Sequence, residues 1–103
     1  MSDFIPVAKL DQIPPSGKRG FYVDGRAVLI LHHEGDYIAI DDGCPHMGSS
    51  LSCGDVKDGC IVCDRHLWRF QLSDGQCLDN EQLRVARHEV RIENDEVQVR
   101  WAE

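Results

Sequence analysis

Two short segments, each with one cysteine and one histidine, limit most strongly what this chain can fold into. Cys44 and His46 are separated by one residue, and sixteen residues later Cys63 and His66 are separated by two. Thiolate and imidazole groups bind transition metals in proteins. If the two segments face each other, their four side chains converge on one metal centre. The fold must therefore hold two loops side by side.

The spacing of these four residues separates two kinds of metal centre. Structural zinc sites usually use pairs of the type Cys-x2-4-Cys, whereas this chain has two mixed Cys/His arms that are sixteen residues apart. The spacing favours an iron–sulfur cluster, and a zinc-stapled interaction domain is the distant alternative. With thiolates on one iron and neutral imidazoles on the other, the histidine-bound iron is the easier one to reduce.

Short apolar runs separated by turn residues predict an all-β sandwich or barrel. Asp24-Gly25 tolerates positive φ angles, so we expect a tight hairpin between residues 20–23 and 27–31. The run 27–31 is the longest uninterrupted aliphatic stretch and is far too short to span a bilayer. Further turns are predicted at residues 34–36, 57–59, 73–75 and 93–95.

The C-terminal third of the chain shows two local irregularities. The apolar residues Leu83 and Val85 are out of phase with Val90 and Ile92, which predicts a bulge or bend between Val85 and Val90. Capping-box spacing over 79–82 predicts one helical turn there. Val97, Val99 and Trp101 alternate as in a strand with one buried face.

The charge balance restricts the possible partners. The 103 residues include 18 Asp and Glu against 11 Lys and Arg, for a formal net charge of -7. This charge argues against nucleic acid and anionic membranes, and favours a partner with a basic docking face. The N-terminus lacks the basic start and apolar run of a signal peptide, so we expect a cytoplasmic protein. Five cysteines in such a chain are more often metal ligands or free thiols than disulfides.

A long central stretch resembles the Rieske ferredoxin family, and it reads CPHMGSSLSCGDVKDGCIVCDRHLWRFQLSDGQCL. The resemblance extends over nearly the whole chain. It implies one compact antiparallel β-sandwich or barrel domain over residues 1–103, with a cluster-binding loop subdomain at about 43–72. It also implies one [2Fe-2S] cluster per chain, with Cys44 and Cys63 on a buried iron and His46 and His66 on an outer iron. Electrons would enter and leave at the histidine end.

Several positions depart from relatives within that family. The disulfide-stapled Rieske proteins of respiratory complexes have extra cysteines where this chain has Ser49 and Arg65, so we expect no disulfide beside the cluster. Those proteins also have Ser and Tyr hydroxyls where this chain has Trp68 and Phe70. Without these donors we expect a low reduction potential, on the order of -150 mV. Leu67 replaces the glycine that commonly follows the second histidine.

The other notable residues have ordinary structural interpretations. We expect small buried or half-buried thiols at Cys53, Cys60 and Cys77. Histidines without spaced partner ligands are expected at the surface or at strand edges, and these are His32, His33 and His88. Trp68 and Phe70 are expected to pack beneath the second loop, and Trp101 in the core or at a strand end.

The resemblance implies a soluble one-electron carrier rather than an enzyme, with no catalytic residues of its own. The expected donor is a flavin-dependent NAD(P)H reductase, and the expected acceptor is a terminal oxygenase of the kind that hydroxylates aromatic rings in aromatic hydrocarbon catabolism. The alternative within electron transfer is the Rieske-like small subunit of an assimilatory nitrite reductase. We expect a monomer, because transient electron-transfer interfaces are small.

Overall fold

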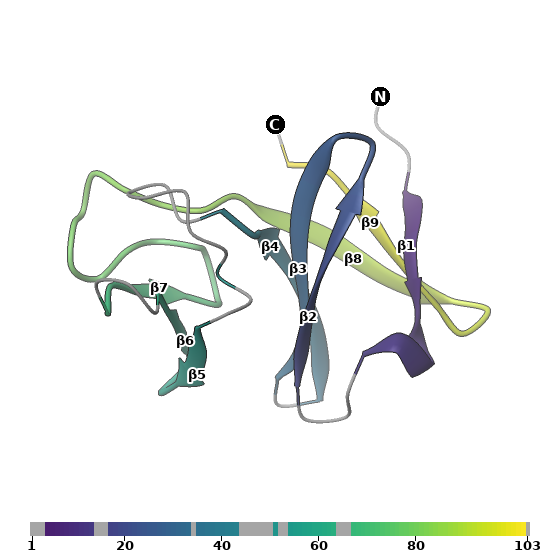
Figure 1. The fold of residues 1–103 in the computed structure, drawn as a ribbon, viewed down its shortest axis with the longest axis horizontal. Coiled ribbons are helices and arrows are strands. Elements are labelled where there is room, and N and C mark those ends of the chain that lie inside the picture. Colours follow the sequence, from purple (N-terminus) through teal and green to yellow (C-terminus); the bar gives the residue numbers. More distant parts are fainter. Residues whose placement is uncertain are drawn as a thin grey trace.

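A computed structural model describes residues 4–13, 17–33, 35–43, 51, 54–63 and 67–102. In this part of the chain, antiparallel strands form a larger sheet of order β1-β9-β8-β4-β3-β2 and a smaller sheet of order β5-β6-β7 (Figure 1). The elements are β1 (Ile5–Lys9), the 3-10 helix η1 (Leu10–Gln12), β2 (Lys18–Val23), β3 (Arg26–His33), β4 (Asp36–Asp41), β5 (Asp55–Lys57), β6 (Cys60–Val62), β7 (Arg69–Gln71), β8 (Arg87–Glu93) and β9 (Glu96–Arg100). The predicted all-β class is confirmed.

The tight turns form where Asp, Asn and Gly predicted them. Asp24 and Gly25 have φ angles of 50° and 78° and join β2 to β3, as the hairpin prediction required. Asp58 and Gly59 have φ angles of 52° and 76° between β5 and β6. These residue types adopt positive φ at low cost, so the turns set the strand register locally.

Strand β3 lies between two hydrophobic cores. Val28 and Ile30 belong to one buried cluster, and Leu29 and Leu31 belong to the other. Successive side chains of a strand point to opposite faces, so β3 is covered on both sides. A strand covered on both faces has no polar alternation. This arrangement explains residues 28–31 of the uninterrupted apolar run, whereas Ala27 is exposed.

The larger sheet curls around the first of these clusters, which we call the inner core. Its edge strands β1 and β2 come into contact, so the sheet is nearly closed. Val97 and Val99 are fully buried in it, as their alternation predicted, and Trp101 packs half-buried just beyond the end of β9. The buried members of the inner core are Ala8, Ile13, Val28, Ile30, Ala39, Val97 and Val99.

The second cluster, which we call the inter-sheet core, joins the smaller sheet to strands β3 and β4. Phe70 is its largest fully buried side chain. Its buried members are Leu29, Leu31, Ile38, Ile40, Leu51, Ile61, Cys63, Phe70, Leu72, Cys77 and Val85. Burying all of these side chains removes a large apolar area from water. Each Å² of apolar surface that is buried stabilises the fold by roughly 25 cal/mol. The smaller sheet is therefore held in place mainly by hydrophobic contact.

The predicted helical turn over 79–82 is wrong. These residues form a non-helical turn, because their polar side chains have other partners. The carboxylate of Asp79 accepts a hydrogen bond from the backbone N–H of Arg69 at 2.8 Å. The side-chain oxygen of Asn80 accepts the N–H of Gln82 at 3.0 Å and closes a local turn. Asp79 is therefore not available to cap a helix.

The predicted bend between Val85 and Val90 is confirmed. Val85 is buried in the inter-sheet core, and its N–H donates to the carbonyl oxygen of Gly75 at 2.8 Å. Strand β8 begins two residues later and pairs with β4 and β9 in the larger sheet. The chain therefore passes from the inter-sheet core into the larger sheet between these two apolar segments, which is why their phases differ.

The prediction of a surface or edge position for His88 is wrong, because its side chain is buried. Nδ1 accepts the backbone N–H of Ala102 at 2.9 Å, so the ring proton is on Nε2. Nε2 then donates to Oδ1 of Asp41 at 2.8 Å. Trp101 packs edge-on against the ring, with 5.0 Å between centroids. His88 therefore ties β8 to β4 and to the C-terminal segment.

Among the residues that the structure describes, no helix has the length and apolar character needed to cross a membrane.

Candidate metal centre

The first ligand loop comprises residues 44–50, with the predicted ligands Cys44 and His46. Hydrogen bonds between the residues that flank this loop close its base, which we call its neck. At its start, the N–H of Asp42 donates to the carbonyl oxygen of Ala27 at 3.1 Å. At its end, Leu51 is fully buried in the inter-sheet core, and its N–H donates to the carbonyl oxygen of Asp42. This hydrogen bond brings together the two ends of segment 44–50, so its base is anchored at both ends.

The second ligand loop is closed by two backbone hydrogen bonds at Cys63. The N–H of Cys63 donates to the carbonyl oxygen of Trp68 at 2.8 Å, and its carbonyl oxygen accepts the N–H of Leu67 at 2.8 Å. Trp68 and Phe70 pack against the inter-sheet core, as predicted for residues beneath this loop. The residues on either side of segment 64–66 are therefore held in place by these hydrogen bonds.

The two necks lie next to each other. Asp55, which follows the first loop, is paired with Val62, which precedes the second loop. A Cβ atom on Gly54 would lie 1.9 Å from the carbonyl oxygen of Val62, so no larger residue fits this approach without movement. The N–H of Gly54 donates to the carbonyl oxygen of Leu51 at 3.0 Å. The two ligand loops consequently extend from adjacent points of the fold.

One of the four predicted ligands lies within the described residues. Cys63 is fully buried and is a free thiol, whereas Cys44, His46 and His66 lie outside the described residues. Within the described ranges, no group of three or more His, Cys, Asp or Glu side chains is placed to hold a metal. A buried free thiol between two closed loops fits one thiolate arm of an iron–sulfur centre.

Two other cysteines of the described chain are buried, as predicted. Cys60 begins β6, and Cys77 lies in the inter-sheet core; both are free thiols. Burial raises the pKa of the Cys60 thiol, which favours its neutral form. Cys53 lies outside the described residues.

An ion pair fixes the exit of the second loop. The guanidinium of Arg69 donates from Nε to Oδ2 of Asp79 at 3.2 Å and from Nη2 to Oδ1 at 2.9 Å. These hydrogen bonds lower the pKa of the Asp79 carboxyl and raise the pKa of the Arg69 guanidinium. The pair connects the start of β7 to the turn at 79–82 and so limits movement of the segment that follows the loop.

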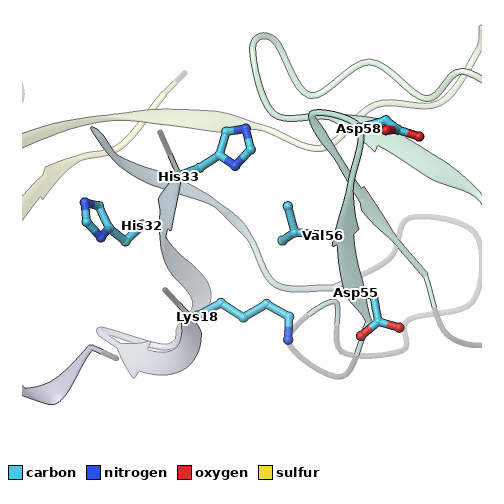
Figure 2. A pocket seen from close by; sticks show the side chains of 7 residues that line it. Lys18, His32, His33, Asp55, Val56 and Asp58 are labelled. Carbon is cyan, nitrogen blue, oxygen red and sulfur yellow. The ribbon is translucent and has the colours of Figure 1, made fainter. Parts of the chain in front are cut away.

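A groove of about 590 Å³ separates the larger sheet from β5, and Figure 2 shows its lining side chains. Lys18 and His33 line it from the larger sheet, and Asp55 and Asp58 line it from β5 and from the turn that follows β5. His33 and its neighbour His32 are half-buried at the end of β3, which lies between β4 and β2, so they lie partly at the surface but not on an edge strand. The groove carries both signs of charge, so it does not indicate a ligand of one charge.

A model of the Rieske [2Fe-2S] domain matches residues 3–95 of the chain. The chain belongs to the Rieske [2Fe-2S] domain family. Membership extends beyond the loops to both sheets, so it accounts for the fold as well as the spacing of the cysteines and histidines. It also establishes one [2Fe-2S] cluster as the cofactor, in agreement with the prediction.

Two relatives show how this Rieske domain occurs in other proteins. A Rieske domain-containing protein of Homo sapiens is 37% identical over 76 residues, which are 70% of this chain and 48% of that protein. The chain thus spans about half the length of that relative. The ferredoxin component of the naphthalene 1,2-dioxygenase/salicylate 5-hydroxylase systems of Ralstonia sp is 29% identical over 99 residues, 95% of each chain.

Solved structures include both kinds of Rieske protein that the sequence suggested. The ferredoxin of carbazole 1,9a-dioxygenase from Nocardioides aromaticivorans has a TM-score of 0.84 at 28% identity, over 93% of this chain and 95% of that one. A structure described as the small subunit of an NADH-dependent nitrite reductase, from Mycobacterium tuberculosis, has a TM-score of 0.88 at 22% identity. The match covers 100% of this chain and 98% of that one. At this identity, the similarity to the nitrite reductase subunit shows a shared fold and nothing about function.

We expect Gly54→Ala to destabilise the protein by about 1–3 kcal/mol, because the added Cβ overlaps the carbonyl of Val62. Gly43→Ala is the matched control at the other end of the first loop, since no described atom lies within 4 Å of the place that its added Cβ would take. Urea unfolding, followed by circular dichroism and by the visible absorption of the cluster, compares the two variants. Equal midpoints for both variants and the unmodified protein would contradict the close approach.

We expect Asp79→Asn to destabilise the protein at neutral pH and to lose this effect in acid. Arg69 holds the pKa of Asp79 below its ordinary value of 3.8. The ion pair therefore stabilises the fold above that ordinary value, and its contribution disappears as the pH falls through the lower folded-state pKa. Unfolding midpoints between pH 7 and about pH 3 test this dependence, with Asp24→Asn in the β2–β3 turn as control. A difference that is independent of pH would rule out the carboxylate as its source.

Proposed function

We propose that this protein carries single electrons from a flavin-dependent NAD(P)H reductase to a terminal oxygenase that hydroxylates aromatic rings. The observation that carries the proposal is the similarity to the Ralstonia ferredoxin component, which covers 95% of both chains. The match is therefore not confined to the cluster loops, and the proteins have nearly the same length. The carbazole dioxygenase ferredoxin supports the same function at 28% identity.

We assign the cluster ligands to Cys44, His46, Cys63 and His66, within a single domain over residues 1–103 whose cluster-binding part spans about 43–72. Cys63 is fully buried, whereas Leu67, four residues later, has 70% of its surface exposed. The described residues on either side of His66 thus differ sharply in exposure. This change in exposure supports a buried cysteine-bound iron and an outer histidine-bound iron.

The cluster supplies one-electron oxidation and reduction, and the surrounding side chains favour a low potential. Phe70 is fully buried, and Trp68 is half-buried against the inter-sheet core. Neither offers a hydroxyl donor to stabilise the extra charge of the reduced state. We therefore propose a potential on the order of -150 mV, at the low end for Rieske centres.

The carrier is proposed to be a cytoplasmic monomer without catalytic residues. Its net charge of -7 suits transient association with basic surfaces of the reductase and the oxygenase. The same charge opposes binding to nucleic acid and to anionic membranes. Oxygen activation and substrate choice are then properties of the oxygenase.

The second candidate is the small subunit of an assimilatory nitrite reductase. It is favoured by the Mycobacterium tuberculosis structure, which has the same fold over the whole length of this chain. Some small subunits of that type lack the cluster ligands, whereas all four residues are present in this sequence. The two functions differ in the acceptor of the electron.

The first test is electron paramagnetic resonance of the dithionite-reduced protein, together with iron and sulfide analysis. We expect two irons and two sulfides per chain, and a rhombic signal whose average g value lies below that of an all-cysteine cluster. Cys63→Ser should abolish the signal, because it removes a ligand. Cys60→Ser, three residues away and also buried, should retain it. One zinc per chain without visible absorption would support the zinc-stapled domain instead.

The second test asks which protein accepts the electron. Purified protein is reduced with NADH and a flavin reductase, and then mixed with a terminal oxygenase and its aromatic substrate, or with a nitrite reductase catalytic subunit and nitrite. We expect it to restore oxygenase turnover and to leave nitrite reduction unchanged. Stable copurification with the nitrite reductase subunit, without support of oxygenase turnover, would favour the second candidate.

A further inference from the structure

We propose that the side chain of Leu67 is a docking contact for the redox partner, a protein whose redox centre has an apolar opening surrounded by basic residues. This inference rests on the proposed function as an electron carrier. It assigns part of the partner interface to one residue of the second ligand loop.

The backbone at Leu67 adopts a conformation that leucine disfavours. Its φ angle is 58°, in the left-handed region. In that region the Cβ atom crowds the backbone, and a leucine side chain offers no compensating hydrogen bond. The other described residues with positive φ, glycine aside, are Asp or Asn: Asp24, Asp58, Asn94 and Asp95. Local conformation therefore does not account for leucine at this position.

Packing against the residues that the structure describes does not account for it either. Leu67 is 70% exposed, whereas its neighbour Trp68 packs against the inter-sheet core. The hydrogen bond at this position is made by the backbone, from the N–H of Leu67 to the carbonyl oxygen of Cys63 at 2.8 Å. Glycine would donate the same bond without the crowding. We therefore infer that the exposed leucine side chain serves contact with another molecule.

The position suits contact with an electron-transfer partner. Leu67 directly follows the proposed ligand His66, so a protein that touches this side chain approaches the histidine end of the cluster. A second exposed leucine, Leu78, lies on the adjacent segment, where its N–H donates to the carbonyl oxygen of Arg69 at 2.8 Å. The ion pair between Arg69 and Asp79 fixes the backbone beside both leucines. A small apolar area on a fixed backbone is typical of transient docking.

Charge selects the occupant of this surface. Each copy of the chain carries a net charge of -7, so two copies repel each other and a second copy is disfavoured. A partner with basic residues around its redox centre is attracted, and its apolar opening can then meet Leu67. We therefore assign the surface to the redox partner rather than to self-association.

The test measures electron transfer from the reduced protein to oxidised cytochrome c, a cationic haem protein with an exposed haem edge. One electron leaves the reduced cluster and converts the ferric haem to the ferrous form. Leu67→Ala removes most of the side chain and keeps a Cβ, and Leu67→Gly removes the crowding as well. Ile92→Ala is the matched control, because Ile92 is exposed near the β8–β9 turn, at the opposite end of the molecule from β5, β6 and β7 (Figure 1).

We expect both Leu67 variants to lower the second-order rate constant with cytochrome c about fivefold, and Ile92→Ala to leave it unchanged. Transfer to ferricyanide, a small anionic oxidant, should be equal in all variants. Leu67→Gly should also raise the urea midpoint, because it relieves the crowding. A variant that is both more stable and slower with cytochrome c would show that leucine is kept for contact rather than for the fold.

Two results would overturn the inference. One is an unchanged rate with cytochrome c in both Leu67 variants. The other is an equal fall in the rates with cytochrome c and ferricyanide, since Leu67 would then act on the cluster and not on docking. Failure of the electron-carrier function is a separate outcome, because it removes the paramagnetic signal of the unmodified protein before any variant is compared.

Discussion

The inter-sheet core is the interaction on which the rest of the structure depends. A sheet of three short strands is marginal by itself, and β5, β6 and β7 have three residues each. Leu29 and Leu31 of β3 give this small sheet an apolar surface to cover, and Leu51 anchors the end of the first loop in the same cluster. Because both loop necks pack on one core, the two loops that carry the predicted ligands start from a common base.

In the second loop, residues held by hydrogen bonds lie next to a residue with an unfavourable backbone conformation. Cys63 is held by backbone hydrogen bonds on both sides, and Arg69 is held by Asp79. Between them, Leu67 has a positive φ angle and an exposed side chain. The strong interactions on either side can impose a conformation that leucine alone would not adopt. A loop of this kind can present an apolar contact to a partner without rearranging the cluster site.

Much of this organisation could be predicted from local sequence. Turn residues such as Asp24 and Gly25 marked the hairpins, because their preference for positive φ depends on the residue itself. The spacing of Cys63 and the three other predicted ligands pointed to the family, because the metal imposes fixed chemistry on few residues. The helical turn over 79–82 was wrong, because Asp79 pairs with Arg69, a residue ten positions away in the sequence. The phase of Val90 and Ile92 could have indicated that His88 shares their face of β8.

The sequence by itself determined the candidate ligand types, the turns and the net charge, since these properties belong to single residues or to near neighbours. Tertiary structure decided which groups meet across the fold. It buried His88 between Asp41 and Ala102, and it brought Gly54 against the carbonyl of Val62. It also set the backbone of Leu67, through hydrogen bonds that depend on how the loop closes. These contacts join residues from different strands, so they arise only when the sheets pack together.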